Sequence, residues 1–495
     1  MNNLVVMPML IPLCVAVMLI FFRTYIKLQK IGVVLAMLLL IVTNIFLLVT
    51  VKEQGIQTLY FGGWEAPFGI TFVADSFAML LVLTASIVAL CCFLYAFSTL
   101  TEDYAKNFAY PLMLFMIAGV NGSFLTGDLF NLFVCFEVML LASYVLITLG
   151  GGKERLRESL KYVIINIFAS WLFLVGLAMI YGTLGTLNMA HLAERVHQIH
   201  QGPVLTTVAL IFLIVFALKA GLFLFYWLPG SYRVPETAIA ALFGALLTKV
   251  GIYALFRTFT LIFTVQENIT HTLIGILACA TIILGSFGAI GYRDLRQIVG
   301  YNVVIGVGFV LLGLYANQTE VLEGAIYYFM HDFIVKALLF LMIGTMIYIT
   351  GRIRFDEIKG LIHHFPLFGW LFFLMMLSLA GIPPFSGFIG KMLLGVGLVD
   401  EGMYITLLLG FLSSIVVLYS LLRVFLKSIF GESMASHQMK KRIPFNMMLA
   451  MMLLMICTIG LGVGAEIAAP FVKDAAHVLT NPSVYIQAVL YPEGG

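Results

Sequence analysis

Length, composition and charge exclude a soluble globular protein. The chain has 495 residues, of which 62% are hydrophobic and only 10% are charged, and its mean hydropathy is +1.08. That much apolar surface has to face lipid, so the chain is predicted to be an all-α polytopic membrane protein. The net charge of +3 is small and dispersed over short loops, which leaves no basic face for a nucleic acid.

Apolar runs long enough to cross a bilayer recur along the whole chain. At about 20 residues for each crossing, they predict about fourteen transmembrane helices in a single transmembrane domain over residues 1–495. The runs are centred on residues 4–21, 31–50, 74–97, 109–126, 129–149, 161–183, 204–227, 237–260, 271–290, 297–315, 322–349, 367–391, 403–426 and 447–470. The first run has no basic segment before it and no small-residue cleavage site after it, which favours a transmembrane helix over a signal peptide.

Lysine and arginine residues gather in alternate loops, and this pattern predicts the orientation. Each rich cluster follows an odd-numbered helix, and the clusters contain Arg23, Lys27, Lys30, Lys153, Arg155, Arg157, Lys161, Arg233, Arg293, Arg296, Arg352, Arg354, Lys359, Lys427, Lys440, Lys441 and Arg442. By the positive-inside rule these loops face the cytoplasm. The chain is therefore predicted to be a multi-pass protein of the cell membrane with both termini outside.

Two outer loops have features of their own. Residues 56–73 pair aromatic with β-branched residues around two glycines, which predicts a hairpin or re-entrant cover, although a plain capping loop fits as well. Residues 184–203 contain Glu194 together with His191, His197 and His200. Such spacing can hold a metal, but the lack of cysteine and of a second carboxylate favours a solvated helix.

No cofactor or metal site is predicted from the motifs. The six cysteines all fall within apolar runs and form no CxxC pair, so they are interpreted as small buried hydrophobic residues. The glycine-rich motifs that bind nucleotides are absent from the sequence.

Charged side chains inside the predicted helices are few. They are Glu137, Lys219, Lys249, His331, Asp332, Lys336 and Lys391. Each would cost roughly 3 kcal/mol facing lipid, so these side chains have to face protein or water. Burial disfavours the charged form of an amine, so a buried lysine without a fixed partner exchanges its proton readily. The row of lysines is therefore the first candidate for a proton path.

Several of these groups allow two interpretations. Glu137 fits a structural ion pair with a lysine of a neighbouring helix, and it also fits a switch that changes the proton affinity of that lysine. Lys219 and Lys249 have no other carboxylate nearby in sequence. Asp332 could pair with Lys336 four residues on, whereas His331 and Lys336 point to different sides of one helix and suit successive steps of a relay.

Two acidic residues stand at predicted helix starts. Asp128 is predicted to cap a helix in the segment TGDLF. Asp75 is predicted to begin a helix, and an entrance role for it is the alternative.

The segment GIPPFSGFIGK, residues 381–391, interrupts an apolar run with two adjacent prolines. Proline removes a backbone donor and breaks the helical hydrogen-bond ladder. Within a bilayer, a broken helix is tolerated only where it is buried in protein or lines a watery cavity, as in secondary transporters. Lys391 follows this break.

Five segments together resemble a known family. They are LFNLFVCFEVMLLASYVLI, ALKAGLFLFYWLPGSY, AALFGALLTKVGIYALFR, HDFIVKALLFL and LSLAGIPPFSGFIGK, which surround Glu137, Lys219, Lys249, Lys336 and Lys391. They resemble the antiporter-like subunits shared by Mrp-type sodium/proton antiporters, respiratory complex I and membrane-bound hydrogenases, and the Mrp branch most closely. The resemblance covers most of the chain.

The resemblance implies a fold and a path. It implies fourteen helices with two inverted five-helix repeats, at about residues 109–260 and 271–427, and with helices seven and twelve broken. It also implies a proton path through Glu137 paired with Lys219, then Lys249, then Lys336 and His331, then Lys391. In residues 222–226 the segment LFLFY lacks the proline and histidine typical of the family.

The function that follows is a proton-translocating subunit of a multisubunit monovalent cation (Na⁺)/proton antiporter, and hence a transporter subunit rather than an enzyme. Its expected partners are the other membrane subunits of an Mrp-type complex, protons, Na⁺ and the lipid bilayer. One alternative is the proton-pumping membrane subunit of a complex I-like quinone reductase or a membrane-bound hydrogenase. A second alternative, a stand-alone solute carrier, would need more polar groups at mid-membrane.

Overall fold

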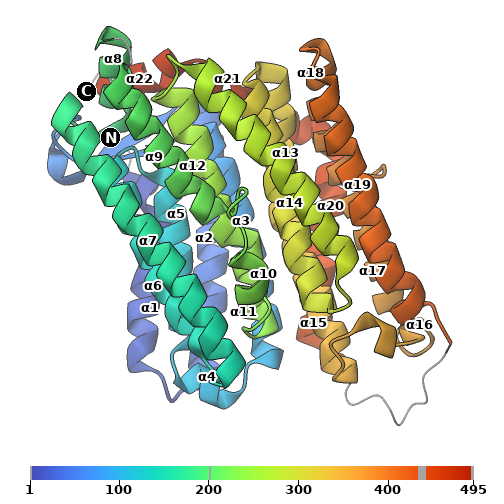
Figure 1. Ribbon diagram of the computed structural model, residues 1–495. Coiled ribbons are helices and arrows are strands. Elements are labelled where there is room, and N and C mark those ends of the chain that lie inside the picture. Colours follow the sequence, from blue (N-terminus) through green and yellow to red (C-terminus); the bar gives the residue numbers. More distant parts are fainter. Residues whose placement is uncertain (1–2, 200–201, 433–441, 492–495) are drawn as a thin grey trace.

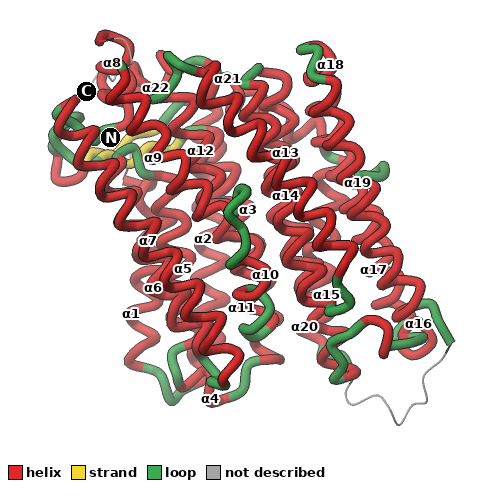
Figure 2. The backbone as a smooth tube through the Cα atoms, viewed as in Figure 1, coloured by secondary structure: helices red, strands yellow, loops and turns green. Residues whose placement is uncertain are grey.

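The structure, a computed structural model, describes residues 3–199, 202–432 and 442–491, and within them the chain is built almost entirely of helices (Figures 1 and 2). The first half contains α1 (Met7–Phe21), α2 (Ile26–Gln54), β1 (Gln57–Tyr60), β2 (Thr71–Ala74), α3 (Ser76–Thr99), α4 (Glu102–Lys106), α5 (Ala109–Leu125), α6 (Leu129–Thr148), α7 (Lys153–Leu184), α8 (Met189–Ile199), α9 (Pro203–Ala220), α10 (Leu228–Ser231), α11 (Thr237–Leu242) and α12 (Thr248–Leu261). The second half contains α13 (Glu267–Gly291), α14 (Leu295–Ala316), α15 (Thr319–Thr350), α16 (Leu361–His364), α17 (Pro366–Ala380), α18 (Ser386–Asp400), α19 (Tyr404–Val424), α20 (Phe445–Val463), α21 (Ala465–Thr480) and α22 (Pro482–Leu490).

The long helices match the apolar runs of the sequence. Twelve helices within the described ranges are long and apolar enough to cross a membrane. Two shorter apolar helices, α5 and α17, occupy two further predicted runs. The predicted all-α polytopic fold is confirmed, whereas the count of about fourteen crossings and the two inverted repeats remain predictions.

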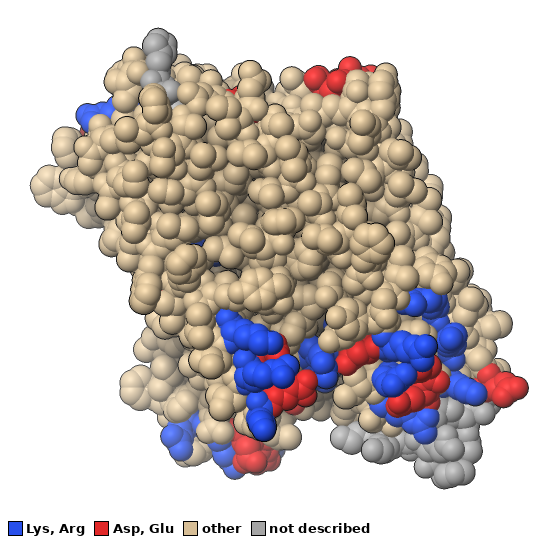
Figure 3. All heavy atoms as spheres, in the orientation of Figure 1, with Lys and Arg blue, Asp and Glu red and all other residues tan. Residues whose placement is uncertain are grey.

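Charge separates the two ends of the molecule. Figure 3 shows Lys, Arg, Asp and Glu side chains gathered at its lower end, below a broad band of uncharged surface. We call this the basic end, because it holds the loops with Arg155, Arg233, Arg293 and Arg354. Both chain termini lie at the opposite end in Figure 1. The termini thus lie on the side away from the basic loops, whereas the prediction that this side faces outside stays a prediction.

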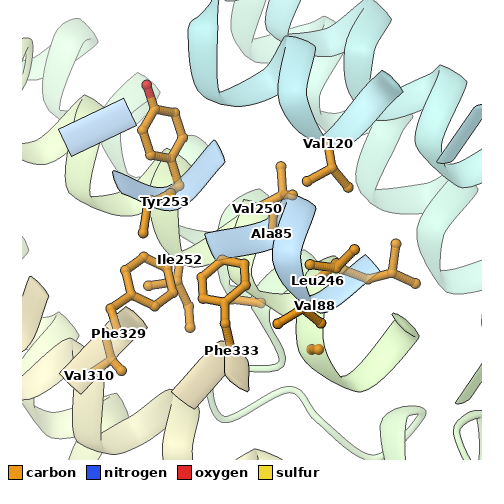
Figure 4. Close-up of a cluster of buried hydrophobic side chains, with 14 of the residues drawn as sticks. Ala85, Val88, Val120, Leu246, Val250, Ile252, Tyr253, Val310, Phe329 and Phe333 are labelled. Atoms are coloured by element: carbon orange, nitrogen blue, oxygen red, sulfur yellow. The ribbon is translucent and has the colours of Figure 1, made fainter. Parts of the chain in front are cut away.

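The core lies where α3, α5, α12, α14 and α15 meet. Figure 4 shows side chains from these helices packed together, among them Val88, Val120, Val250, Val310 and Phe333. All five are fully buried. Helices such as α1, α2, α7 and α19 bury only one side and turn an apolar side outward, which suits a surface that faces lipid.

The opposite end is covered by a hairpin and short helices. Strands β1 and β2 pair antiparallel with Gln57 opposite Ala74, which confirms the predicted hairpin. Tyr60 of this hairpin donates a hydrogen bond from its hydroxyl to the carbonyl of Val489 in α22, at 2.7 Å. The C-terminal helix thereby holds the hairpin against the bundle.

The histidine-bearing loop forms the amphipathic helix α8. His191 accepts a hydrogen bond from Arg195 Nε at 3.0 Å, and His197 lies 3.3 Å from Thr264 Oγ1. Within the described ranges, no three His, Cys, Asp or Glu side chains gather as they would around a metal ion. His200, the third histidine of the predicted loop, and Lys440 and Lys441 of the last basic loop lie outside the described residues.

Helix α9 ends one residue after Lys219. Gly221 has a φ of +76° and Phe223 a φ of +59°, so the chain leaves the helix in a left-handed turn that favours glycine. The Phe223 amide then donates to Thr281 Oγ1 of α13 at 2.8 Å, and only the single turn α10 follows. The run predicted over 204–227 is therefore broken, even without a proline in residues 222–226.

A second break separates α17 from α18. Helix α17 ends at Ala380, Gly381 follows with a φ of +84°, and the helix resumes at Ser386 beyond the two prolines. The interruption predicted from GIPPFSGFIGK is confirmed. It leaves the last carbonyls of α17 without intrahelical donors.

Asp128 provides a pH-dependent prediction. It caps α6 as expected, accepting a hydrogen bond from the Asn131 amide at 2.8 Å, but burial raises the pKa of its carboxyl to about 6. A raised pKa means that the folded chain binds this proton more tightly than the unfolded chain. Stability is therefore lost as the pH rises from about 4 to about 6, by up to about 3 kcal/mol.

Asp128→Asn keeps the capping acceptor and removes the titration. We expect this variant to melt at a higher temperature than the wild type at pH 8, and at the same temperature at pH 4. Thermal unfolding of the two purified proteins between pH 4 and pH 8 measures the difference. Identical melting at pH 8 would show that the Asp128 carboxylate carries no penalty.

Candidate functional site

Glu137 of α6 and Lys219 of α9 meet at a serine of α7. Ser170 donates a hydrogen bond from Oγ to Glu137 Oε1, and Lys219 Nζ donates to Ser170 Oγ at 3.1 Å. The Lys219 side chain is buried, and its ammonium lies 4.9 Å from the ring centroid of Phe136. Carboxylate and ammonium are therefore linked through a hydroxyl instead of forming the direct pair that the resemblance implies.

The close approach of α12 fixes the end of α9 beside this cluster. A Cβ at Gly251 would overlap the backbone of Lys219 and Ala220. The small residue thus lets the two helices touch at the level of the lysine. Helix α12 also holds Lys249, one half-turn before that contact.

Lys249, Asp332 and Lys336 form one buried charge cluster. Lys249 Nζ lies 2.6 Å from Asp332 Oδ2, and Lys336 Nζ lies 3.4 Å from Asp332 Oδ1. All three side chains are at most 1% exposed. Lys249 has no carboxylate nearby in sequence, but the fold brings α15 to the start of α12 and places Asp332 beside it.

The backbone around this cluster is adapted to it. A π-helical turn, Phe243–Leu247, precedes α12, and its Gly244 carbonyl accepts a hydrogen bond from Lys249 Nζ at 3.2 Å. Such turns recur at functional sites. On the far side, a Cβ at Gly306 of α14 would overlap the Asp332 carboxylate. The carboxylate thus has room for its two lysines and little more.

His331 turns away from that cluster toward α18. Its Nδ1 lies 2.8 Å from Ser386 Oγ, and its Nε2 has no hydrogen-bond partner within the described ranges. Ser386 is the first residue after the α17–α18 break. The imidazole therefore lies between the charge cluster of α15 and the broken helix.

Lys391 occupies the break itself. Its ammonium donates to the carbonyls of Leu379 at 2.8 Å and Ala380 at 3.0 Å, the carbonyls that the break leaves free. Negative partial charge at a helix C-terminus favours a cation there. The side chain is 6% exposed, and it lines a mainly apolar cavity of about 510 Å³ between α18 and α19.

The structure thus places the predicted residues in three groups. Glu137 and Lys219 share Ser170, Lys249 and Lys336 share Asp332, and His331 and Lys391 flank the second break. Ser170 gave no signal in the sequence, because serines in membrane helices commonly bond their own helix. For Asp332, the sequence indicated only a possible pair with Lys336, four residues on.

A further buried ion pair was missed. Arg257 Nη2 lies 2.6 Å from Asp75 Oδ2, and both side chains are at most 3% exposed. Asp75 also caps α3, as predicted, by accepting from the Ala78 amide at 2.8 Å. Arg257 stands near the end of an apolar run, where an arginine usually reaches the membrane surface, and its burial is seen only in the fold.

Three comparisons with known proteins agree on the family. The model of the family described as NADH:quinone oxidoreductase/Mrp antiporter, TM, matches residues 126–418. The D subunit of the Na⁺/H⁺ antiporter of Bacillus subtilis is 45% identical over 491 residues, covering 99% of this chain and all of the relative. The chain belongs to this antiporter family. The D subunit of the Na⁺/H⁺ antiporter of Alkalihalophilus pseudofirmus is 46% identical with the same coverage.

Within the family, the segments HDFIVKALLF and GALLTKVGIYALFR and Lys391, the last lysine of the row, are typical of D subunits, and the match to two D subunits confirms this. Among solved structures, a chain of the Mrp complex from Dietzia sp. superposes with a TM-score of 0.92 at 29% identity, covering 99% of this chain and all of that one. A chain of respiratory complex I from Thermus thermophilus, 23% identical over 99% of this chain and all of that one with a TM-score of 0.85, shares the fold.

Proposed function

We propose that the chain is the proton-translocating subunit of a multisubunit Na⁺/proton antiporter, with protons moving along Glu137, Lys219, Lys249, His331, Lys336 and Lys391. The observation that carries the proposal is the Asp332 carboxylate between two buried ammonium groups from α12 and α15. Ionisable groups inside membrane proteins are costly and typical of proton relays. The similarity to antiporter D subunits supports the same function.

The Ser170 bridge supports transfer between Lys219 and Glu137. Ser170 accepts from the ammonium while donating to the carboxylate. A proton moving from nitrogen to the hydroxyl, as the hydroxyl proton moves to the carboxylate, yields a neutral amine and a neutral carboxylic acid. The two charges disappear together, which favours the exchange in a medium of low dielectric constant.

The Asp332 cluster supports a switch between two lysines. Its carboxylate is 0.8 Å closer to Lys249 than to Lys336, from 2.6 and 3.4 Å. A carboxylate favours the charged form of the amine that it pairs with more tightly. Movement of Asp332 from one lysine to the other would release a proton from the first and retain one on the second.

Function within an assembly is supported by the surface around Glu137. This carboxyl is only partly buried, and Val134 and Leu141 on the same side of α6 are 40% and 60% exposed. A carboxylate at a lipid-facing surface is costly, so a partner subunit fits this face better than lipid. We propose the other membrane subunits of an Mrp-type complex as partners and a location in the cell membrane with both termini outside.

The repeats at about 109–260 and 271–427 are part of the proposal. Each contains one broken helix with a lysine at the break, Lys219 in the first and Lys391 in the second. Lys219 lies in the last turn of α9, before the first break, and Lys391 lies in α18, after the second break. The presence of a lysine beside each broken helix supports two related half-paths that join at the Asp332 cluster.

A redox-driven role is the second candidate. A chain of a membrane-bound sulfane sulfur reductase is 26% identical and superposes with a TM-score of 0.91, covering 99% of this chain and all of that one. The same proton path would serve such a complex. Quinone- or sulfur-reductase activity that co-purifies with the chain would favour this candidate over the antiporter.

Sodium-dependent ΔpH in vesicles carrying the whole complex tests the path. We expect Glu137→Ala and Lys219→Ala to lower the exchange rate by at least about tenfold, because each removes a positioned proton-transfer group. Lys161→Ala is the matched control, since Lys161 is exposed at the basic end and pairs only with Glu158 within the described ranges. Normal exchange in both path variants would rule out the proposed path.

A further inference from the structure

Three cavities at the basic end meet at Arg296. One, of about 300 Å³, lies beside Gly151, Lys153, Arg155 and Arg233 and is called here the basic cavity. A second, of about 260 Å³, is lined by hydroxyl groups and is called the hydroxyl cavity. A third, the inner cavity, has about 10 Å³, the size of a single water position. Arg296 lines all three.

The cavities lead toward Lys249. Thr237 and Gly344 line both the hydroxyl cavity and the inner cavity, and Phe340 forms the inner wall of the latter. The Phe340 ring lies on Gly244, where any Cβ would overlap it. The Gly244 carbonyl accepts from Lys249. One aromatic side chain therefore separates the inner cavity from the hydrogen bonds of the Asp332 cluster.

Arg296 differs from the other two arginines of this mouth. Arg233 pairs with Glu154 and Asp294 at 2.9 and 3.2 Å, and Arg155 pairs with Glu236 at 3.6 Å. Arg296 has no carboxylate within 4 Å in the described part of the chain. Its Nη1 donates to the Arg233 carbonyl at 2.8 Å, which fixes the guanidinium at the junction.

We propose that Arg296 is the specificity-determining residue of the proton entrance and excludes metal cations from it. This inference rests on the proposed function. Na⁺ cannot dispense with its hydration shell beside a fixed positive charge, and an arginine in a narrow pore is an electrostatic barrier to metal cations and to hydronium alike. A proton crosses the same place by transfer between water and the groups at hand, namely the Glu236 carboxylate and the Tyr104 and Thr237 hydroxyls.

The first test measures charge selectivity without transport. The variant is Thr237→Cys in the whole complex, with the six native cysteines of this chain replaced by alanine. Its thiol reports which reagents reach the inner side of Arg296. Everted vesicles expose the basic end to two methanethiosulfonate reagents of similar size, one neutral and one bearing a quaternary ammonium. For each reagent, the rate of reaction at Thr237→Cys is divided by its rate at Lys153→Cys on the surface. We expect this ratio to be at least about tenfold larger for the neutral reagent than for the charged one.

Arg296→Gln should lower that preference to about threefold or less, whereas Arg296→Lys should keep it. Arg293→Gln is the matched control, because Arg293 is 68% exposed and pairs with Asp356. Glu236→Gln removes a negative charge from the hydroxyl cavity and should raise the preference, so an Arg296→Gln complex that fails to assemble does not end the test. An unchanged preference in Arg296→Gln, or a Thr237→Cys that the neutral reagent cannot reach, would overturn the inference.

The second test measures leakage. In vesicles carrying the complex, Arg296→Gln should raise sodium entry that is not coupled to proton exit severalfold, and Arg296→Lys should restore coupling. Coupling as tight as in the wild type would contradict the inference. Normal exchange in Glu137→Ala and Lys219→Ala would instead remove the proposed function and leave the labelling result intact, so the two failures are distinguishable.

Discussion

Asp332→Asn should lower cation/proton exchange by the assembled complex about a hundredfold or more. The change leaves Lys249 and Lys336 in a fully buried site without their shared carboxylate, 2.6 and 3.4 Å away in the wild type. Two unpaired ammonium groups repel each other and cannot both stay charged there. At least one lysine becomes neutral and the relay between them is lost. Sodium-dependent ΔpH in everted vesicles measures the effect.

Two further variants sharpen this prediction. Asp332→Glu restores the charge, but Gly306 leaves no room for an added methylene, so we expect only partial recovery. Asp356→Asn is the matched control, because Asp356 pairs with Arg354 at the surface of the basic end, and its loss should change exchange less than about twofold. Wild-type exchange by Asp332→Asn, in a complex that assembles normally, would show that this cluster is not on the path.

The fold can be predicted from the sequence because a lipid environment allows few backbone structures. Apolar runs of the right length can only be helices that bond internally, so the positions of the long helices follow from hydropathy. Adjacent prolines at 383 and 384 likewise predict the break before Lys391. The α9 break is harder to predict, because GLFLFYW is as apolar as a helix interior and only Gly221 marks the turn.

The sequence predicts which residues belong to the site, but it does not predict which residues they pair with. Buried lysines are rare enough to single out in any membrane sequence, which is why Lys219, Lys249, Lys336 and Lys391 were predicted together. Their partners depend on tertiary packing. Asp332 reaches Lys249 only because α15 packs against the π-helical turn before α12, and Ser170 reaches both Glu137 and Lys219 only because α7 packs against both α6 and α9.

Breaking the ion pair between Asp75 and Arg257 should destabilise the fold by about 3–5 kcal/mol. Arg257 also donates from Nε to the Tyr253 hydroxyl at 3.1 Å, and its guanidinium lies 5.0 Å from the ring centroid of Tyr485 in α22. Arg257→Met removes these contacts and leaves the Asp75 carboxylate buried and alone. The pair ties α3 and α12 to the C-terminal helix, so unfolding should begin with α22.

A double-mutant cycle separates the charges from the packing. Asp75→Asn keeps the cap on α3 and removes only the charge, leaving Arg257 unpaired. The double variant has no buried charge left, so we expect it to be more stable than either single variant. The purified complex of each of the four proteins is heated, and the temperature at which this subunit is released measures its stability.

The exposed pair between Lys52 and Asp474 is the control for this cycle. Its nitrogen and oxygen are also 2.6 Å apart, but the two side chains are 36% and 40% exposed. Water screens such a pair, and Lys52→Met should cost less than about 1 kcal/mol. Equal losses at the two sites would mean that burial does not set the value of these ion pairs. A double variant less stable than both single ones would mean that the Asp75–Arg257 pair stabilises the fold through its packing instead of its charge.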